Sequence, residues 1–190
     1  MSNLIAHERA KYDDVWATVS AYGKHSPGAA LVPVFESMRR DAGPVTILDA
    51  GCGSGKGALA LTAAGHIVTC ADTTPTGLVD EALGLPFVTV NLWDDLTPLG
   101  RFQYVYCCDV LEHIPPTLTM LVVVRLLAIA ERGLFLNIST QPDHFGAWIG
   151  SPLHLTVQSF TDWRDQLNAV GRVVEARDLL TSGAYLVEAR

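Results

Sequence analysis

The fold of this chain is decided by the stretch Val45-Thr46-Ile47-Leu48-Asp49-Ala50-Gly51-Cys52-Gly53-Ser54-Gly55-Lys56-Gly57. Its first residues are apolar and rich in β-branched side chains, which predicts a short buried strand. Four alternating glycines follow, and glycine is needed where a backbone turns sharply or lies directly against a ligand. The next residues, 58–61, suit a helix whose free N–H groups point back at the loop. This order of strand, glycine loop and helix is typical of a nucleotide-binding site.

Two nucleotide-binding patterns match the loop only in part. The phosphate-binding pattern G-x-x-x-x-G-K-[ST] fits Gly55-Lys56, but its first glycine would be Ala50 and its hydroxyl residue would be Gly57. The dinucleotide pattern G-x-G-x-x-G/A can be laid on residues 53–58 and ends in alanine. A glycine-rich turn that binds no ligand is a third alternative.

A fourth interpretation uses every feature of the loop. The pattern Asp-x-Gly-x-Gly-x-Gly, from Asp49 through Gly51 and Gly53 to Gly55, resembles motif I of the class I S-adenosylmethionine-dependent methyltransferases. The resemblance implies that these residues lie under the methionine part of S-adenosylmethionine, which has no phosphates and needs no lysine. We therefore expect S-adenosyl-L-methionine as the cofactor.

Further cofactor residues are expected where the next strands end. Asp72, followed by Thr73, closes a predicted strand over 66–72, about 20 residues beyond the loop, where a carboxylate can accept both ribose hydroxyls. The third strand, 86–91, ends at Asn91, where the family has an acidic residue. The resemblance places adenine here, against Asn91, the N–H of Leu92 and the ring of Trp93, with Asp94 as an alternative acceptor.

The fourth predicted strand, 102–110, contains Asp109 and runs into Val110-Leu111-Glu112-His113-Ile114. This string resembles the motif that follows strand four in small-molecule methyltransferases of the ubiquinone-biosynthesis type. Together with residues 138–157 it also looks like a compact subgroup from phage and bacterial genomes. The resemblance implies that Asp109 belongs to the cofactor site.

Three histidines are candidates for a general base, because an imidazole titrates near neutrality. They are His113, His154 and His144, the last with Asp143 as an orienting partner; each is alternatively a structural hydrogen-bonding residue. With Glu112 and Asp143 they would also offer mixed nitrogen and oxygen ligands to a divalent metal. None of their spacings is diagnostic, and we expect no metal.

The predicted elements alternate between strands and helices and give one α/β domain over residues 1–190, with a helical cap over 1–42 and a core over 43–190. We expect a doubly wound, Rossmann-like sheet of seven mostly parallel strands, the last one antiparallel, with helices on both faces. The predicted helices include 8–22, 29–41 and one from Thr74 to Gly84, and 141–154 is predicted to be a long loop. A dinucleotide dehydrogenase would need a substrate domain, for which no residues are left.

Composition narrows the partners. Thirteen basic and twenty acidic side chains leave a net charge of −7, which disfavours stable nucleic-acid binding. The four cysteines form no C-x-x-C pair and are expected to be reduced thiols in a cytoplasmic protein. The start of the chain has no signal-peptide pattern, and the apolar run from Met120 to Ala130 is interrupted by Arg125, so no membrane span is expected. That run is expected to form a core helix, with a homodimer as a further expectation.

The sequence thus predicts transfer of a methyl group to a small-molecule or single-nucleoside acceptor by in-line displacement, with a histidine as base. Two alternatives stay open. One is a nucleic-acid methyltransferase, although the Asn-Pro-Pro-Tyr type of motif is absent and Ile114-Pro115-Pro116-Thr117 echoes it only superficially. The other is a non-catalytic relative of the fold that binds the cofactor or a partner.

Overall fold

A computed structural model describes residues 2–19, 22 and 26–190, with side chains from residue 7 onward. The chain is built on one seven-stranded sheet in the order β3-β2-β1-β4-β5-β7-β6. Its strands are β1 (Thr46–Ala50), β2 (Ile67–Asp72), β3 (Phe87–Thr89), β4 (Phe102–Cys108), β5 (Ala130–Ser139), β6 (Arg172–Asp178) and β7 (Ser182–Glu188). β1 to β5 pair in parallel, and β7 runs antiparallel to both β5 and β6. The predicted doubly wound sheet with a reversed last strand is confirmed.

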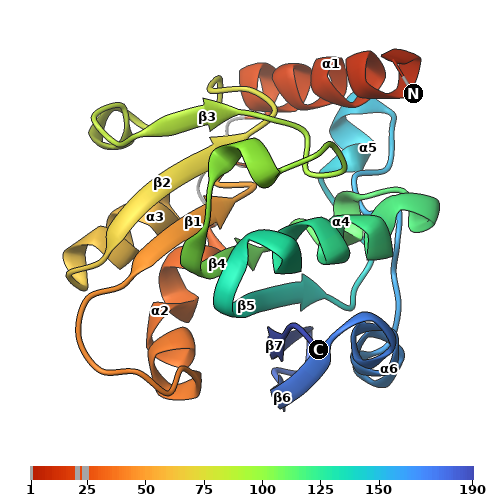
Figure 1. The fold of residues 1–190 in the computed structure, drawn as a ribbon. Helices are drawn as coiled ribbons and strands as arrows, with labels where there is room; N and C mark the ends of the chain where they lie inside the picture. The colour runs from red at the N-terminus through yellow and green to blue at the C-terminus, as the bar shows by residue number, and fades with distance from the viewer. Residues whose placement is uncertain (1, 20–21, 23–25) are drawn as a thin grey trace.

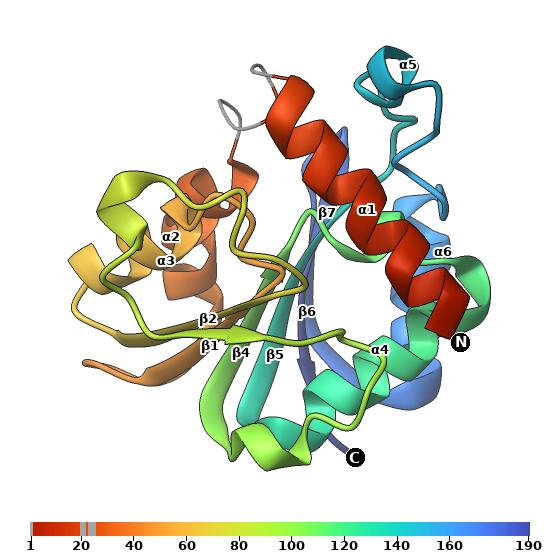
Figure 2. The same ribbon diagram turned by 90° about the horizontal axis from the view of Figure 1, so that it is seen from above.

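Helices cover both faces of the sheet (Figures 1 and 2). They are α1 (Ser2–Thr18), α2 (Pro27–Met38), α3 (Lys56–Ala63), α4 (Pro116–Ile129), α5 (Gly146–Ile149) and α6 (Phe160–Val170), with 3₁₀ turns η2 (Asp80–Ala82), η3 (Thr97–Leu99) and η4 (Leu111–His113). α2 and α3 lie on one face, and α4 and α6 on the other. α1 crosses above the carboxyl ends of the strands (Figure 2). Among the described residues, none of the helices combines the length and apolar character that a membrane span requires.

The core has two layers because each parallel strand is covered on both faces. Under α2, the ring of Phe35 makes edge contacts with Tyr104, Tyr106 and Phe135 at centroid distances of 5.3, 5.6 and 5.5 Å. On the other face, α6 buries Trp163 completely. The start of α6 is capped, because the Ser159 hydroxyl accepts from the N–H of Asp162.

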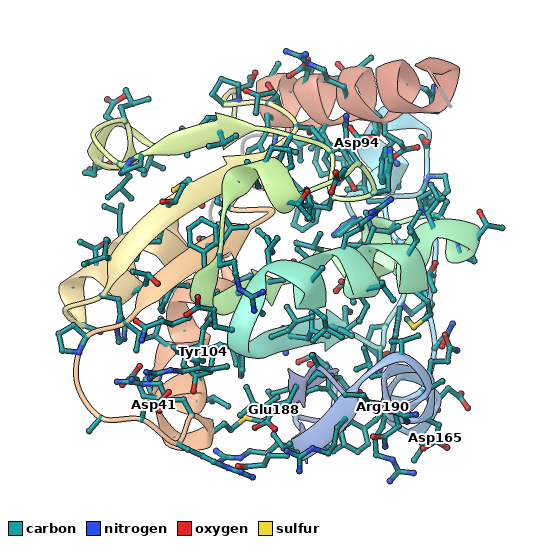
Figure 3. All side chains as sticks on the ribbon, viewed as in Figure 1. Asp41, Asp94, Tyr104, Asp165, Glu188 and Arg190 are labelled. Carbon is teal, nitrogen blue, oxygen red and sulfur yellow. The ribbon has the colours of Figure 1, made fainter. Side chains whose placement is uncertain are left out.

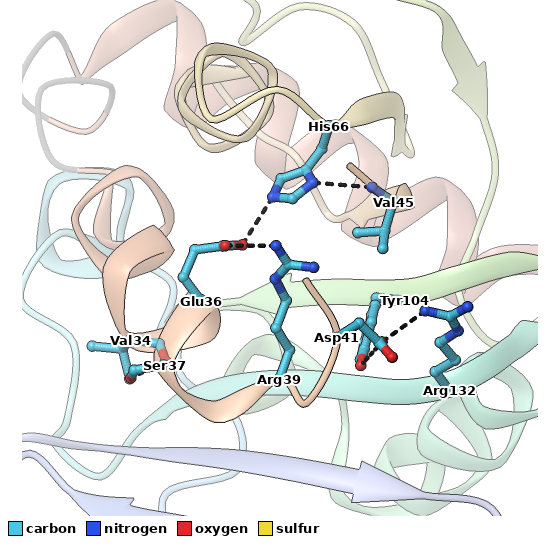
Figure 4. Close-up of polar contacts among 9 residues, drawn as sticks. All are labelled: Val34, Glu36, Ser37, Arg39, Asp41, Val45, His66, Tyr104 and Arg132. Atoms are coloured by element: carbon cyan, nitrogen blue, oxygen red, sulfur yellow. Dashed lines mark hydrogen bonds and ion pairs between the residues drawn. The ribbon is translucent and has the colours of Figure 1, made fainter. Parts of the chain in front are cut away.

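A polar cluster fixes α2 to the amino ends of the strands, on the side opposite to the glycine loop (Figure 4). The N–H of Val45 donates to Nδ1 of His66 at 3.3 Å, so Nε2 of this ring carries the hydrogen that faces Oε1 of Glu36 at 2.8 Å. Arg39 donates to the other oxygen of Glu36 at 2.7 Å. The carboxylate of Glu36 therefore joins α2 to the residue that leads into β2.

A second carboxylate joins the same edge to β4 and β5. The hydroxyl of Tyr104 donates to Oδ2 of Asp41 at 2.6 Å, and Arg132 lies 2.9 Å from the same oxygen. Figure 3 shows Asp41 and Tyr104 together at this edge, with Asp94 at the opposite edge of the molecule. Since both clusters lie far from the loop after β1, we assign them to stability.

Three predicted elements differ from the structure. The helix expected from Thr74 to Gly84 is wrong: only η2 forms there, because the N–H of Val79, which a helix would pair with the carbonyl oxygen of Pro75, donates to that of Ser54 at 3.1 Å. The predicted loop over 141–154 contains α5. The helix predicted over 8–22 corresponds to α1, which ends at Thr18, and residues 20–21 of that prediction lie outside the described residues.

Candidate functional site

A cavity of about 520 Å³ lies at the carboxyl ends of β1, β2, β4 and β5. Its floor is the glycine loop after β1, and its roof is formed by α1 and the segment 141–154. In an open α/β sheet, ligands bind at this edge of the strands. Most of the site residues that the sequence predicts line this cavity: Asp49, Gly51, Gly53, Asp72, Thr73, Leu92, Trp93, Asp109, His113, His144 and His154.

The glycine loop has a conformation that other residues would disturb. Gly51 and Gly53 have φ values of +77° and +49°, in the left-handed region. A Cβ atom at Gly51 would collide with the side chain of Val110, and one at Gly53 would lie 3.2 Å from the ring of Trp16. Glycine is therefore required at both positions by the left-handed backbone and by the neighbouring side chains, and both residues line the cavity.

Asp72 at the end of β2 is bound to this loop. The N–H of Gly53 donates to Oδ2 of Asp72 at 2.8 Å, and the N–H of Thr73 donates to Oδ1 at 2.7 Å. Burial raises the pKa of Asp72, and these N–H groups oppose the rise. Oδ1 also accepts from the hydroxyl of Thr73 at 3.3 Å, so Oδ2 keeps a lone pair for a ligand hydroxyl, and Oδ1 gains one when the Thr73 hydroxyl turns away.

Asp49 at the end of β1 is buried, with an exposed fraction of 4%, and its Oδ2 atom has no hydrogen-bond partner. Burial, followed by the charge of Asp72, raises the pKa of Asp49 to about 7. An unpaired buried acceptor is costly and is usually satisfied by a ligand or water. A cationic amino group placed over the loop would satisfy Asp49, so the residues present fit the aminoalkyl part of S-adenosylmethionine.

Two predicted cofactor residues do not line the cavity. The amide of Asn91 donates to Asp94 at 3.0 Å, whereas Leu92 and Trp93 face the cavity. Gly55 points the other way: a Cβ atom there would lie 2.5 Å from Ala82 of η2. The structure thus gives Gly55 a role in turning the chain into α3, where it is the N-cap residue with φ +74°.

His113 and His154 come together although 41 positions separate them. Nδ1 of His113 lies 3.1 Å from the carbonyl oxygen of Leu153, and Nδ1 of His154 lies 2.6 Å from that of Gln141. A carbonyl oxygen only accepts, so both Nδ1 atoms carry hydrogen and both Nε2 atoms keep a free lone pair. The rings are nearly perpendicular, with centroids 4.7 Å apart. Burial lowers the pKa of His113 to about 4, which keeps its imidazole neutral.

His144 is exposed, and the orienting partner expected for it serves another purpose. The carboxylate of Asp143 accepts from the N–H groups of Gly146, Leu153 and His154, at 2.5, 2.8 and 3.3 Å. Although burial opposes them, these hydrogen bonds lower the pKa of Asp143. The expectation that Asp143 orients His144 is therefore wrong: Asp143 folds the roof segment and positions His154.

Glu112 has a structural role that the sequence analysis does not assign. It is fully buried, its Oε1 accepts from the N–H of Ser139 at 2.5 Å, and its carbonyl oxygen accepts from the N–H groups of Leu155 and Thr156. Burial, then the charge of Asp109, raises its pKa well above the usual range. Glu112 thus ties the segment after β4 to the end of β5 and to residues 155–156, which follow the roof segment. Its place beside His113 in the motif was the available signal.

Aromatic rings close the remaining side of the cavity. Tyr12 packs edge-on against His113 with centroids 5.8 Å apart, and Tyr22 does so against both Trp16 and Phe145, at 4.8 and 5.7 Å. The structure shows these rings lining the cavity.

Comparison with known proteins connects this cavity to one class of enzyme. Residues 48–130 match a family model described as a methyltransferase domain. The chain is 28% identical over 171 residues to the chloroplastic magnesium protoporphyrin IX methyltransferase of Arabidopsis thaliana, an alignment that covers 79% of this chain and 54% of that protein. The chain thus spans about half the length of this curated relative.

Solved structures share the fold. Magnesium protoporphyrin IX methyltransferase from Synechocystis PCC 6803 with bound S-adenosylmethionine matches with a TM-score of 0.60 and 21% identity, over 85% of this chain and 76% of that one. A Burkholderia thailandensis 1,6-didemethyltoxoflavin-N1-methyltransferase, with bound 1,6-didemethyltoxoflavin and S-adenosylhomocysteine, matches with a TM-score of 0.67 and 17% identity, over 98% and 88%. The chain has the fold of S-adenosylmethionine-dependent methyltransferases, and residues 48–130 match the model of their domain.

Proposed function

We propose that this chain is a class I S-adenosylmethionine-dependent methyltransferase that acts on a small molecule or a single nucleoside. One observation supports this most strongly: the unpaired buried Oδ2 of Asp49 and the loop-bound carboxylate of Asp72 face one cavity across bare glycine backbone. Asp49 suits the amino group of the cofactor's methionine part, and Asp72 suits the hydroxyls of its ribose.

Six residues would hold the cofactor. Asp49 would accept from the amino group, the backbone of Gly51 and Gly53 would lie under the methionine chain, and Asp72 would accept from both ribose hydroxyls. Trp93 would cover the adenine ring, with Leu92 beside it. When bound, S-adenosylmethionine supplies a methyl group on a sulfonium sulfur. A nucleophile would attack the methyl carbon in line with the bond to sulfur, and the sulfur would leave.

The acceptor would lie between the histidine pair and the aromatic wall of the cavity. His113 is the proposed base, because its Nε2 lone pair is free while its Nδ1 is held by Leu153. Its low pKa keeps the ring ready to accept a proton at neutral pH, although it also makes the imidazole a weak base. Tyr12 and Phe145 would orient a flat acceptor by ring contacts.

Calorimetry with S-adenosylhomocysteine tests the cofactor site. We expect the wild type to bind one molecule per chain, and Asp72→Ala and Gly53→Val to lose binding by at least about tenfold, since Asp72→Ala removes hydrogen bonds to a charged acceptor. Asp165→Ala on exposed α6 and Gly84→Val, where a Cβ meets nothing within 4 Å, are matched controls. Absence of binding by the wild type, or full binding by both site variants, would contradict the proposal.

The acceptor itself is accessible to labelling. Cell extract incubated with methyl-labelled S-adenosylmethionine and the protein should yield a labelled small molecule that is absent from the Asp72→Ala reaction. Label on oligonucleotides, with a gel shift at low salt, would support the nucleic-acid alternative. Cofactor binding without transfer to any acceptor would support the non-catalytic alternative.

The subgroup, the division of the domain, the compartment and the oligomeric state are part of the same proposal. Val110-Leu111-Glu112-His113-Ile114 supports a place near the ubiquinone-biosynthesis type and its compact phage and bacterial subgroup. We assign residues 1–42 to a cap and 43–190 to the core of a single domain. The free cysteines support a cytoplasmic site of action. Exposed Leu121 and Val124 on α4 support a homodimer, which sedimentation would test.

A further inference from the structure

The groups around the histidine pair form a second kind of site. One ligand atom from each of Asp109, His113 and His154 lies within 4.8 Å of the other two. We propose that these three residues bind a divalent first-row transition-metal ion at the acceptor end of the cavity. The sequence analysis assigned Asp109 to the cofactor and offered Asp143 and His144 as metal ligands instead. In the structure, Asp143 accepts from backbone N–H groups and His144 is exposed, so neither belongs to this cluster.

Both imidazoles are already oriented as metal ligands are. A metal-binding histidine usually donates its other ring N–H to a carbonyl or carboxylate, which fixes the tautomer and the direction of the lone pair. Here the carbonyl oxygens of Leu153 and Gln141 hold the two Nδ1 atoms, so His113 and His154 both offer Nε2. These two carbonyl groups of the roof segment fix the ring orientations, which reduces the reorganisation that metal binding would require.

The third ligand, Asp109, lies beside a buried carboxyl group. Asp109 has φ +60°, an uncommon conformation for a residue other than glycine, and its N–H is held by the carbonyl oxygen of Asn137 at 2.9 Å. The fully buried Glu112 leaves Oε2 without a partner, and it interacts electrostatically with Asp109. The carboxyl group of Asp109, the unpartnered Oε2 of Glu112 and the two imidazole rings together offer oxygen and nitrogen atoms that a cation would satisfy.

The ligand types indicate which metals fit. Imidazole nitrogen suits Fe²⁺, Ni²⁺, Cu²⁺ and Zn²⁺, whereas Mg²⁺, Ca²⁺ and Mn²⁺ prefer oxygen ligands. Three protein ligands would leave coordination positions open. Since all three residues line the same cavity as Gly51 and Gly53, an open position would face the acceptor.

The role of the ion rests on the proposed methyl transfer. An acceptor hydroxyl bound to the metal would become more acidic and release its proton to solvent, and its oxygen would then bond to the methyl carbon as the carbon–sulfur bond breaks. The products would be a methyl ether and neutral S-adenosylhomocysteine. In the metal-loaded protein the Nε2 lone pair of His113 is occupied, so the base role proposed above would apply only to the metal-free protein. The acceptor class would be molecules with a metal-binding hydroxyl.

Metal binding can be measured without any acceptor. The full chain, stripped with EDTA and dialysed, is titrated with Co²⁺ and followed by visible absorption and calorimetry. We expect the wild type to bind one Co²⁺ per chain. His154→Gln and Asp109→Asn should each lower the Co²⁺ affinity by more than the roughly tenfold that losing a hydrogen-bond partner of a metal ligand costs. His7→Gln, at an exposed histidine of α1, is the matched control and should bind as the wild type does.

The variants must remain folded for the result to count, so each is checked by thermal unfolding. His154 is only half-buried, and Asn tolerates a positive φ nearly as well as Asp, which makes these two substitutions the mildest. No stoichiometric Co²⁺ binding by the wild type, or equal affinity in folded His154→Gln, would overturn the metal site. Binding of S-adenosylhomocysteine to the same stripped protein would show that the cofactor proposal survives that failure.

Discussion

The N–H of Gly53 donates a 2.8 Å hydrogen bond to Oδ2 of Asp72, which joins the loop after β1 to the end of β2. This bond holds the carboxylate at the edge of the glycine loop, where it can accept from a ligand that lies on the loop. It also makes the loop conformation and the direction of Asp72 interdependent. The proposed cofactor site is therefore largely formed before a ligand binds.

The first prediction concerns Gly51. Alanine there would have to adopt φ +77° and its Cβ would collide with Val110, whereas Gly43 has nearly the same φ, +78°, with nothing within 4 Å of a Cβ. We expect Gly43→Ala to lower the free energy of unfolding by about 1–2 kcal/mol from the left-handed backbone alone. Gly51→Ala should cost about 1–3 kcal/mol more, from the collision.

Urea denaturation of both variants measures this difference. A second substitution, Val110→Ala, should recover part of the extra loss in the Gly51→Ala background and none in the Gly43→Ala background. Equal destabilisation by the two glycine variants would show that the contact with Val110 carries no strain.

A second prediction separates stability from ligand binding at Asp49. In the folded protein the pKa of this carboxyl is raised to about 7, above its unfolded value of about 4. The free energy of unfolding therefore falls as the pH rises from about 4 to about 7, where the group ionises in the unfolded chain first. Asp49→Asn removes the charge and should raise the melting temperature at pH 8 by about 4 °C, or roughly 1–2 kcal/mol for a domain of this size. The gain should disappear below about pH 4, where the wild-type carboxyl is protonated in both states.

The same variant should bind S-adenosylhomocysteine more weakly, because an amide does not pair with a cationic amino group as a carboxylate does. Higher stability together with weaker binding is the expected signature. A lower melting temperature for Asp49→Asn at pH 8 would show that the carboxylate has a structural partner.

The third prediction concerns proton release. At pH 6 the buried Asp49 is mostly protonated, and a bound amino cation would lower its pKa, so binding should release up to one proton. Calorimetry in phosphate and in Tris, which differ in ionisation enthalpy, measures that number. The release should be close to zero at pH 8.5 and absent from Asp49→Asn; an unchanged release in the variant would assign it to another group.

A fourth prediction concerns acid stability. Hydrogen bonds from Arg39 and His66, opposed by burial, lower the pKa of Glu36, and the Tyr104 hydroxyl and Arg132 lower that of Asp41. Their folded pKa values lie below the unfolded ones, so both groups stabilise the protein above about pH 4 and lose that contribution as the pH falls through the folded values.

Unfolding free energies measured from pH 2 to pH 7 test this. Glu36→Gln and Asp41→Asn should each lower stability at neutral pH and flatten the decline below pH 4. Asp165→Asn, which changes an exposed carboxylate on α6, should leave the curve unchanged. A parallel decline in all three variants would assign the acid transition to other carboxyls.

The sheet arrangement and the edge at which the cavity lies could be predicted because their signals are local. The loop from Asp49 to Gly57 contains its own turn residues, and the carboxyl ends of parallel strands meet at one edge whatever the side chains around them. The helix expected at Thr74 could not be excluded, because the hydrogen bond that replaces a helical one at Val79 is made to Ser54, which is distant in the sequence. Tertiary contacts outweighed the local helix propensity of this segment.

The side-chain partners were the less predictable part for the same reason. Asp143 stands next to His144, yet its carboxylate binds three backbone groups of the roof segment, one of them ten residues away. Gly55 shares the alternating pattern of the loop, but the turn directs it toward η2. His113 and His154 meet only because β4 and the roof segment approach one another in the folded chain.

A crystal structure of the full chain grown with S-adenosylmethionine tests the central claim most directly. We expect electron density for one cofactor molecule along residues 51–54, with its ribose hydroxyls on Asp72, its amino group on Asp49 and its methyl group directed toward His113 and His154. Density at another edge of the sheet, or none at saturating cofactor, would contradict the account of the site and the roles assigned to its residues.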